Sequence, residues 1–308
     1  MKKLIVVLLF VPFIIHGQTE KISKFKVTIL STMLSDWYTG EWGFSALIEA
    51  DDKKVLFDTG LRENTVINNA KELKIDLNNI SNVFLSHNHK DHTGGLINLK
   101  NNFSDSFSNA HVGDGIFLKR LTKNLIHAYI LDNKKEMENL GINFINHKYP
   151  SQILPGIWTT GVIQRIHDEK NWSKTGKIID TNKNIIEDNI PEDQSLFFDT
   201  AKGIVLISGC GHAGIINTIE HVKKILPDRP IYMILGGFHV HNLNDSKLKW
   251  TANNLKESGV QYFIGAHCTG INSTYKLRKY MGLSSHKALV GSVGTYINND
   301  GVFPGKMQ

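Results

Sequence analysis

Short apolar runs recur along the chain, and most of them are bounded by Gly, Asp or Asn. Runs of this kind predict buried strands. Between some of the runs, apolar residues recur at helical spacing, once around Val66 to Leu73 and once around Ile215 to Leu226. Strands and helices together imply a layered α/β or α+β domain. The strands predicted are Lys26–Leu30, Ala46–Glu49, Lys54–Phe57, Val83–Leu85, Leu196–Phe198, Ile204–Ile207, Ile231–Leu235 and Tyr262–Ile264.

The order of these elements changes along the chain. The N-terminal part is typical of hairpins followed by βα units, and the C-terminal third alternates between strand and helix. The stretch Asn101–Pro155 is polar-rich and less regular. We interpret it as an excursion of the chain over the functional site rather than as part of the core sheets. We expect part of the substrate specificity to come from this stretch.

The first residues differ from the rest. Two lysines precede the apolar run Leu4–Ile15, and Gly17 follows it. A basic start, a short apolar run and a small residue are typical of a secretory signal peptide, and the run is too short to span a bilayer. The alternative is a buried N-terminal strand, which Pro12 disfavours. We therefore predict a signal peptide at 1–17, a mature domain at 18–308, and export to the periplasm or the medium.

Composition narrows the classes of protein. A chain of 308 residues with 41% hydrophobic and 21% charged residues is neither disordered nor, with 2 Cys, a disulfide scaffold. The formal charge of 35 − 29 = +6 falls to 33 − 29 = +4 without the two lysines of the predicted signal peptide. This small positive net charge, without a block of basic residues, predicts no nucleic-acid partner. No stable membrane span is expected, and the oligomeric state is left open.

One segment concentrates the chemistry. His87, His89, Asp91 and His92 occur within six positions, directly after the predicted strand Val83–Leu85. The first two imidazoles alternate off the strand end and can hold one metal ion. Asp91 and His92 come from the following turn and can face a second. Neutral imidazoles with a carboxylate suit Zn²⁺, Fe or Mn²⁺. The alternative is a polar, solvated loop.

This string resembles the His-x-His-x-Asp-His hallmark of the metallo-β-lactamase superfamily. The resemblance runs from about Lys26 to Gly291 and implies an αββα sandwich with a dinuclear metal site at one edge of the two sheets. It narrows to the branch of metal-dependent hydrolases related to the archaeal dihydropterin ribofuranosyl-aminobenzene phosphate synthase. The segments that carry it are Phe57–Gly60, Trp158–Gly161, Glu192–Leu196, Ser208–Ile215, Gly236–His239 and His267–Gly270.

The resemblance implies roles for individual residues. His212 is implied as the third ligand of the first metal, beside His87 and His89, and His267 as the last ligand of the second, beside Asp91 and His92. Asp58 is implied to support the ligands. Cys210 stands where many members carry a bridging Asp, so it is either a thiolate ligand or a small buried residue.

The other His and Cys residues receive simpler interpretations. His239 follows a predicted strand, and it either contacts substrate or donates a proton to a leaving group, or else supports the structure. Cys268 is expected to pack, with a disulfide to Cys210 as the alternative. Surface or satisfied core positions are expected for His111, His127, His147, His167, His221, His241 and His286.

These observations lead to a functional prediction. The protein is expected to be a metal-dependent hydrolase with two divalent ions, Zn²⁺ being favoured over Mn or Fe. A metal-bound hydroxide would attack a phosphoryl or carbonyl centre, with Asp91 orienting it. The resemblance implies a phosphate-bearing or other anionic small molecule, which backbone N–H groups of Thr93–Gly95 and Thr269–Gly270 would receive. The alternatives are an iron-dependent redox enzyme, a non-catalytic metal-binding protein and, within the hydrolases, a β-lactam hydrolase.

Overall fold

A computed structural model describes residues 20–121, 129–173 and 175–305. The predicted signal peptide lies outside these ranges. Among the described residues, no helix is long and apolar enough to cross a membrane. The helices are α1 (Thr65–Glu72), α2 (Lys90–Thr93), α3 (Leu96–Asn102), α4 (Tyr129–Asp132), α5 (Lys134–Asn139), α6 (Ile215–Ile225), α7 (Asp245–Glu257) and α8 (Ile271–Met281), with a 3₁₀ turn, η2 (His267–Thr269).

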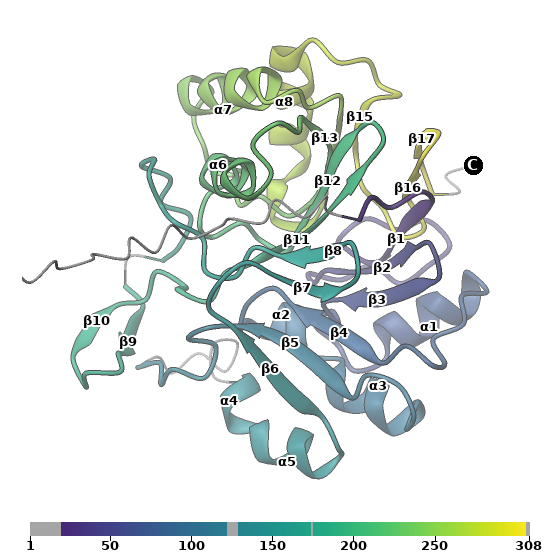
Figure 1. Ribbon diagram of the computed structural model, residues 1–308, viewed down its shortest axis with the longest axis vertical. Coiled ribbons are helices and arrows are strands. Elements are labelled where there is room, and N and C mark those ends of the chain that lie inside the picture. The colour runs from purple at the N-terminus through teal and green to yellow at the C-terminus, as the bar shows by residue number, and fades with distance from the viewer. Residues whose placement is uncertain (1–19, 122–128, 174, 306–308) are drawn as a thin grey trace, which may run out of the picture.

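Two mixed sheets form the centre of the molecule (Figure 1). The first has the order β17-β16-β1-β2-β3-β4-β5-β6, and its strands from β3 to β6 run parallel. Its strands are β1 (Phe25–Ser31), β2 (Ser45–Ala50), β3 (Lys53–Phe57), β4 (Asn82–Leu85), β5 (Asn109–Gly113), β6 (Asn143–His147), β16 (Tyr296–Asn298) and β17 (Gly301–Phe303).

The second sheet has the order β15-β14-β13-β12-β11-β8-β7, with β12 to β15 parallel. Its strands are β7 (Ser151–Leu154), β8 (Ile157–Thr159), β11 (Ser195–Thr200), β12 (Gly203–Ser208), β13 (Ile231–Gly236), β14 (Tyr262–Gly265) and β15 (Ala288–Val290). A separate hairpin of β9 (Lys177–Ile179) and β10 (Ile185–Glu187) projects from the body of the molecule (Figure 1).

Three buried clusters hold these layers together. The central cluster packs the inner faces of the two sheets against each other, with Phe57 and Phe84 from one sheet and Phe198 and Leu235 from the other. A second cluster packs α6, α7 and α8 on the outer face of the second sheet, and a third packs α1, α3 and α5 on the first. The order helix, sheet, sheet, helix confirms the predicted αββα sandwich (Figure 1).

The sequence explains why β12 and β13 lie at the centre of their sheet. Every residue of Gly203–Ser208 and Ile231–Gly236 is buried, as in parallel strands that are covered on both faces. α6 follows β12 and turns Ile215, Ile219 and Val222 inward at helical spacing. Because β12, β13 and β14 run parallel, their carboxyl ends meet at one edge, where ligand sites of open α/β sheets form.

All eight predicted strands and both predicted helices are present. The interpretation of Asn101–Pro155 as an excursion outside the sheets is wrong. Within it, β5 and β6 extend the first sheet and β7 joins the second. Their strand character was hidden because sequences such as Asn109–Gly113 (NAHVG) alternate small, polar and apolar residues.

Candidate metal centre

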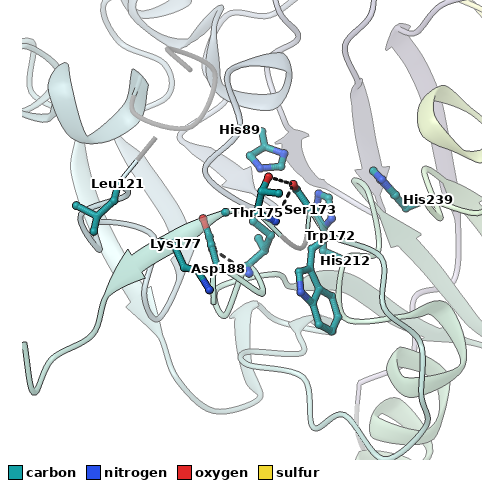
Figure 2. Close-up of a pocket in the computed structure, with 11 residues that line it drawn as sticks. His89, Leu121, Trp172, Ser173, Thr175, Lys177, Asp188, His212 and His239 are labelled. Carbon is teal, nitrogen blue, oxygen red and sulfur yellow. Dashed lines mark hydrogen bonds between the residues drawn. The ribbon is translucent and has the colours of Figure 1, made fainter. Parts of the chain in front are cut away.

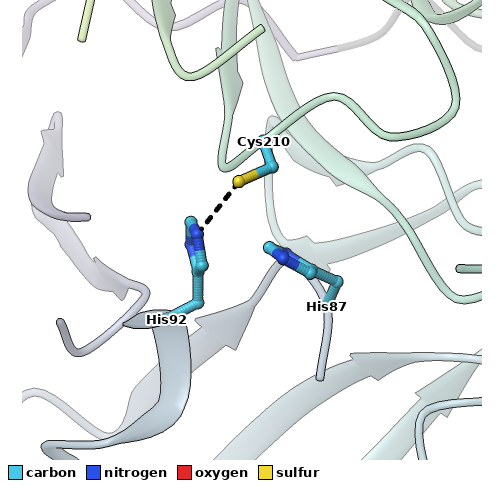
Figure 3. Close-up of side chains that lie close together, drawn as sticks. All are labelled: His87, His92 and Cys210. Carbon is cyan, nitrogen blue, oxygen red and sulfur yellow. Dashed lines mark hydrogen bonds between the residues drawn. The ribbon is translucent and has the colours of Figure 1, made fainter. Parts of the chain in front are cut away.

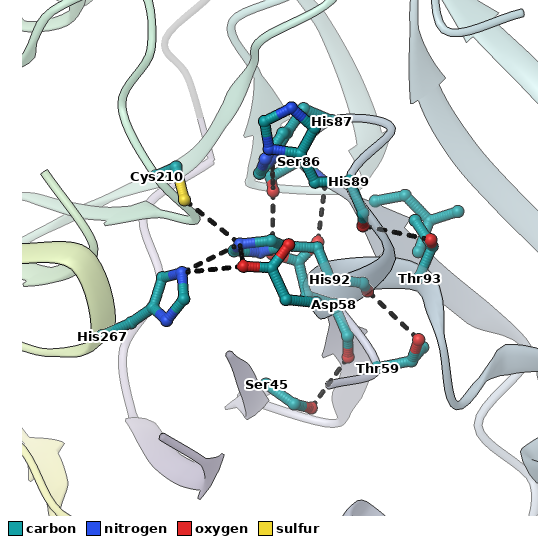
Figure 4. A network of polar contacts seen from close by, with 12 residues as sticks. Ser45, Asp58, Thr59, Ser86, His87, His89, His92, Thr93, Cys210 and His267 are labelled. Carbon is teal, nitrogen blue, oxygen red and sulfur yellow. Dashed lines mark hydrogen bonds and ion pairs between the residues drawn. The ribbon is translucent and has the colours of Figure 1, made fainter. Parts of the chain in front are cut away.

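The chemistry begins where β4 ends. The chain bends at His87 and Asn88 directly after β4, His89 is extended, and α2 begins at Lys90, so His87 and His89 both lie in the short loop after the strand end. The single turn of α2 carries Asp91 and His92, and Figure 4 shows His92 beside His87 and His89. The compact spacing in the sequence therefore becomes a cluster of four donors on one loop.

His87, His89 and His212 form the first donor group, because their donor nitrogens lie within 4.8 Å of one another. His212 comes from the turn between β12 and α6, so the two sheets both contribute. Burial holds the pKa values of His87 and His212 well below the usual range, so both imidazoles are neutral. Neutral imidazole is the form that binds a metal.

Hydrogen bonds fix the tautomers of these two imidazoles. Ser86 donates its hydroxyl proton to Asp58 Oδ2 at 2.8 Å, so its oxygen accepts from Nδ1 of His87 at 2.9 Å. Nδ1 of His212 donates to the Asn171 carbonyl. The lone pair of each ring therefore lies on Nε2, and neither Nε2 has a hydrogen-bond partner among the described residues. Two buried, partnerless acceptors that point into one group fit a cation.

Asp91, His92 and His267 form the second donor group, also within 4.8 Å. Nε2 of His267 lies 3.3 Å from Asp91 Oδ2 and 3.3 Å from Nε2 of His92. Burial opposes ionisation of Asp91, but the imidazoles of His92 and His267 outweigh it and lower the pKa of this carboxyl. Asp91 is thus a carboxylate in the protein, as a cation ligand must be.

Asp58 supports both groups. Its Oδ2 lies 2.6 Å from Nδ1 of His92, and its Oδ1 accepts the Ser86 N–H at 2.7 Å. Burial opposes the charged imidazole, yet the Asp58 and Asp91 carboxylates raise the pKa of His92 to about 9. A cation at Nε2 of His92 would take the place of that proton.

Cys210 lies between the two groups (Figure 3). Its Sγ is 3.1 Å from Nε2 of His92 and belongs to a cluster within 4.8 Å that includes His87. The thiol is buried and free, and burial raises its pKa. This is the location expected of a bridging ligand. Cys268 is also a free, buried thiol, so the two cysteines do not form the alternative disulfide.

A cavity of about 340 Å³ opens onto the first donor group. His89, His212 and His239 line one side, as Figure 2 shows, and His239 lies with its ring centroid 4.8 Å from that of His212. The opposite side comes from Leu121 and from a segment between β8 and β11: Trp172, Ser173, Thr175, Gly176, Lys177, Asp188 and Ile190. Among the described residues, Leu121 is therefore the only part of the predicted Asn101–Pro155 that lines this cavity.

Three of the predicted anion-binding N–H groups already have partners in the protein. Gly94 donates its N–H to the carbonyls of Gly60 and Lys90, and Gly270 donates to His267. Thr269 donates its N–H to Ala266. For these three N–H groups the expectation is wrong, because they donate to carbonyls that close the turns next to the ligands.

Several supporting residues have no compact sequence signal. Glu192 is fully buried, accepts the Asn88 N–H at 3.2 Å and pairs with Arg120 at 2.7 Å. The neighbouring Asp193 accepts the Ala213 N–H at 2.8 Å, next to His212, and burial raises its pKa to about 7. The Glu192–Leu196 segment of the resemblance had marked this place without assigning these contacts.

The remaining histidines follow the simpler interpretation where the structure describes them. His111 and His147 stack in the first sheet and share a 2.9 Å hydrogen bond. His286 is exposed, and His127 lies outside the described residues. Neither His111 nor His147 belongs to a donor group.

Comparison with known proteins shows the family to which the chain belongs. The family model described as the metallo-beta-lactamase superfamily matches residues 40–223. The chain therefore belongs to the metallo-β-lactamase superfamily, a superfamily of metal-dependent hydrolases whose members bind divalent metal ions.

Individual relatives are also similar. The 7,8-dihydropterin-6-methyl-4-(beta-D-ribofuranosyl)-aminobenzene-5'-phosphate synthase of Methanocaldococcus jannaschii is 29% identical over 266 residues, covering 82% of this chain and 90% of the relative. The solved structure of Tm1679, a metal-dependent hydrolase of the beta-lactamase superfamily, has a TM-score of 0.70 at 22% identity and covers 89% and 98% of the two chains. Zn(2+)-bound PqqB from Methylobacterium extorquens has a TM-score of 0.53 at 12% identity, covering 88% and 99%.

Proposed function

We propose that the protein is a hydrolase that works with two divalent cations. His87, His89 and His212 would hold the first, and Asp91, His92 and His267 the second, with Cys210 between them. The observation that carries this proposal is the pair of buried Nε2 atoms on His87 and His212, whose tautomers are fixed and which have no partner among the described residues.

Zinc fits the donors best. Imidazole nitrogen, carboxylate oxygen and thiolate sulfur are all ordinary Zn²⁺ ligands, whereas Mg²⁺ and Ca²⁺ prefer oxygen. When bound, the cations would polarise the substrate and make a water molecule acidic enough to attack at neutral pH.

Two side chains of the protein would handle the proton transfers of the reaction. Asp91 is held as a carboxylate and offers Oδ1, which has no hydrogen-bond partner among the described residues, to orient the nucleophile and receive its proton. His239, which follows the end of β13, lines the cavity beside His212. Burial opposes its charged form, but neighbours led by Cys268 raise its pKa, which suits a donor of a proton to the leaving group.

A small anionic substrate, and a phosphate ester in particular, suits the cavity. Lys177 supplies a cationic group, and the hydroxyls of Ser173 and Thr175 lie nearby, 2.9 Å apart. The similar archaeal synthase carries a 5'-phosphate in the name of its product. Because the cavity is about 340 Å³, it fits a small molecule rather than a polymer segment.

We further propose that the protein is exported, on the strength of the apolar run Leu4–Ile15. Mass determination of the protein from its native compartment tests this. A mass that lacks residues 1–17 supports export, and retention of the intact N-terminus in a cytoplasmic fraction contradicts it.

The hydrolase proposal is tested with protein loaded with Zn²⁺, and separately with Mn²⁺ or Fe²⁺. Elemental analysis should find at least two cations per chain, and a panel of phosphomonoesters, phosphodiesters, lactones and β-lactams should reveal hydrolysis of a phosphate ester. His87→Ala should lose one cation and nearly all activity. His286→Ala, at an exposed position, should keep the full number of cations and the full activity. Two bound cations with no hydrolysis of any substrate would overturn the catalytic proposal and favour redox or binding functions.

A further inference from the structure

Cys210, His239 and Cys268 form a third donor group, in which the proposed hydrolysis uses Cys210 as a bridging donor and His239 as a proton donor and leaves Cys268 without a role. Their donor atoms lie within 4.8 Å of one another. They come from the turns after β12, β13 and β14, the three parallel strands whose carboxyl ends meet at this edge. Residues separated by up to 58 positions in the chain are thus brought to one point.

All three side chains are largely buried, and neither cysteine is bonded to another cysteine. The two cysteines are only 2% and 1% exposed, and neither is in a disulfide. The Cys268 thiol makes a long hydrogen bond of 3.7 Å to the Cys210 carbonyl, and its other partners are the side chains of Cys210 and His239. Nδ1 of His239 is buried without a hydrogen-bond partner among the described residues. A buried nitrogen without a hydrogen-bond partner calls for an explanation, and a bound cation would provide one.

The backbone is shaped around the group. His239 has φ of 48°, in the left-handed region that a β-carbon disfavours, so packing must hold it there. A β-carbon on Gly237 would lie 2.9 Å from Cys268 Sγ and 2.1 Å from the Gly209 carbonyl oxygen. Only glycine lets the β13 turn approach the two sulfur-bearing turns this closely.

We propose that Cys210, Cys268 and His239 bind a third cation, of the thiophilic class to which Zn²⁺, Cd²⁺ and Cu⁺ belong. Two thiolates and one imidazole select such ions over Mg²⁺ or Ca²⁺. His239 also lines the cavity beside His212, so the site has a route of entry. This cation would tie together the three turns that carry His212, His239 and His267, with Cys210 shared between it and the centre described above.

The experiment is a titration of metal-free, reduced protein with Cd²⁺. Bound cadmium is counted by elemental analysis, and the ultraviolet thiolate-to-cadmium charge-transfer band is followed. The wild-type protein should bind three equivalents. Cys268→Ser should bind two and lose at least half of the band, while His286→Gln should bind three with the band unchanged.

Two results would overturn the third site. One is saturation of the wild-type protein at two equivalents, and the other is a third equivalent that persists in Cys268→Ser. Cadmium NMR of the wild-type protein gives a separate signal for each bound ion and needs no variant: one signal must have the shift of a cadmium with two sulfur neighbours, and signals of cadmium with at most one sulfur alone refute the site. His89→Ala should remove a nitrogen-bound cation and leave the two-sulfur one, so failure of the hydrolase proposal is distinguished from failure of this one.

Discussion

Asp58 Oδ2 lies 2.6 Å from Nδ1 of His92, and both side chains are completely buried. The same carboxylate oxygen accepts the Ser86 hydroxyl, whose oxygen in turn accepts from His87. One carboxylate therefore sets the ring orientation of a histidine from each donor group. A residue that contacts no cation in the proposed centre nevertheless decides where two donor nitrogens point.

Replacing Asp58 should weaken metal binding while leaving the fold intact. We expect Asp58→Asn to bind Zn²⁺ about 10–100-fold more weakly, the range typical for loss of a partner behind a metal ligand. Asn has the shape of Asp and tolerates the backbone at this position, where φ is 51°. Competition with a chromophoric chelator measures the affinity. Asp76→Asn, at an exposed position, is the control, and equal affinities in the two variants would contradict the role given to Asp58.

Loss of the Arg120 guanidinium should destabilise the folded protein, because Arg120 forms a buried cluster with Glu192 and Asp188. Arg120 contacts Glu192 at 2.7 Å and Asp188 at 3.0 Å. Arg120→Met leaves two carboxylates unpaired, and we expect the free energy of unfolding to fall by about 3–5 kcal/mol. Lys134→Met removes an exposed pair with Glu138 and should cost less than about 1 kcal/mol. Urea unfolding of both variants checks this, and similar losses in the two would contradict it.

His111 should make stability depend on pH. Burial lowers the pKa of His111 from 6.5 to about 4. Between these values the unfolded chain binds a proton that the folded protein does not, so stability falls as pH decreases from 6.5 towards 4. The loss at pH 5 relative to pH 8 should be roughly 2 kcal/mol.

The test compares unfolding free energies at pH 8 and pH 5 for the wild-type protein and His111→Asn. The variant is less stable at pH 8 but should lose less on acidification. His147, whose pKa burial also lowers, keeps part of the slope. His286→Asn controls for the removal of one imidazole, and an unchanged slope in His111→Asn would contradict the assignment.

Zinc should stabilise the folded protein through the first donor group. A ligand that binds only the folded state at 100 times its dissociation constant adds about 2.7 kcal/mol. His89→Ala should lose most of the gain that this group supplies, because its three donors come from two sheets and are not assembled in the unfolded chain. Thermal unfolding with and without Zn²⁺ measures the gain. If His89→Ala gains as much as the wild-type protein, the first group is not a binding site.

Local pattern revealed most of the fold. β3 and β13 carry continuous apolar runs, and α6 has a clear apolar face, so short windows of sequence suffice to predict them. β6, with the sequence Asn-Phe-Ile-Asn-His, has only partly buried residues along most of its length. It is a strand because β5 lies beside it, and pairing of this kind is a tertiary property that no short window contains.

The candidate site likewise has one part that the sequence predicted and another part that it did not. His87 to His92 share one loop, so their spacing carried the prediction. The contact between Glu192 and Asn88 joins positions 104 apart, and Trp42 lies over His267 with ring centroids 4.9 Å apart although the two residues are distant in the chain. Closeness of this kind follows from the packing of two sheets, and single-residue chemistry does not encode it.

The separation of the two halves of the centre also has a consequence for biosynthesis. His92 and His267 are 175 positions apart, yet their Nε2 atoms meet at 3.3 Å. At ribosomal speeds of about 5–20 residues per second, the second emerges roughly 9–35 s after the first. During that interval the nascent chain presents an incomplete set of donors. The proposed second cation can therefore bind at its full set of donors only after His267 has been synthesised, so the ions available at that late stage decide which cation is taken up.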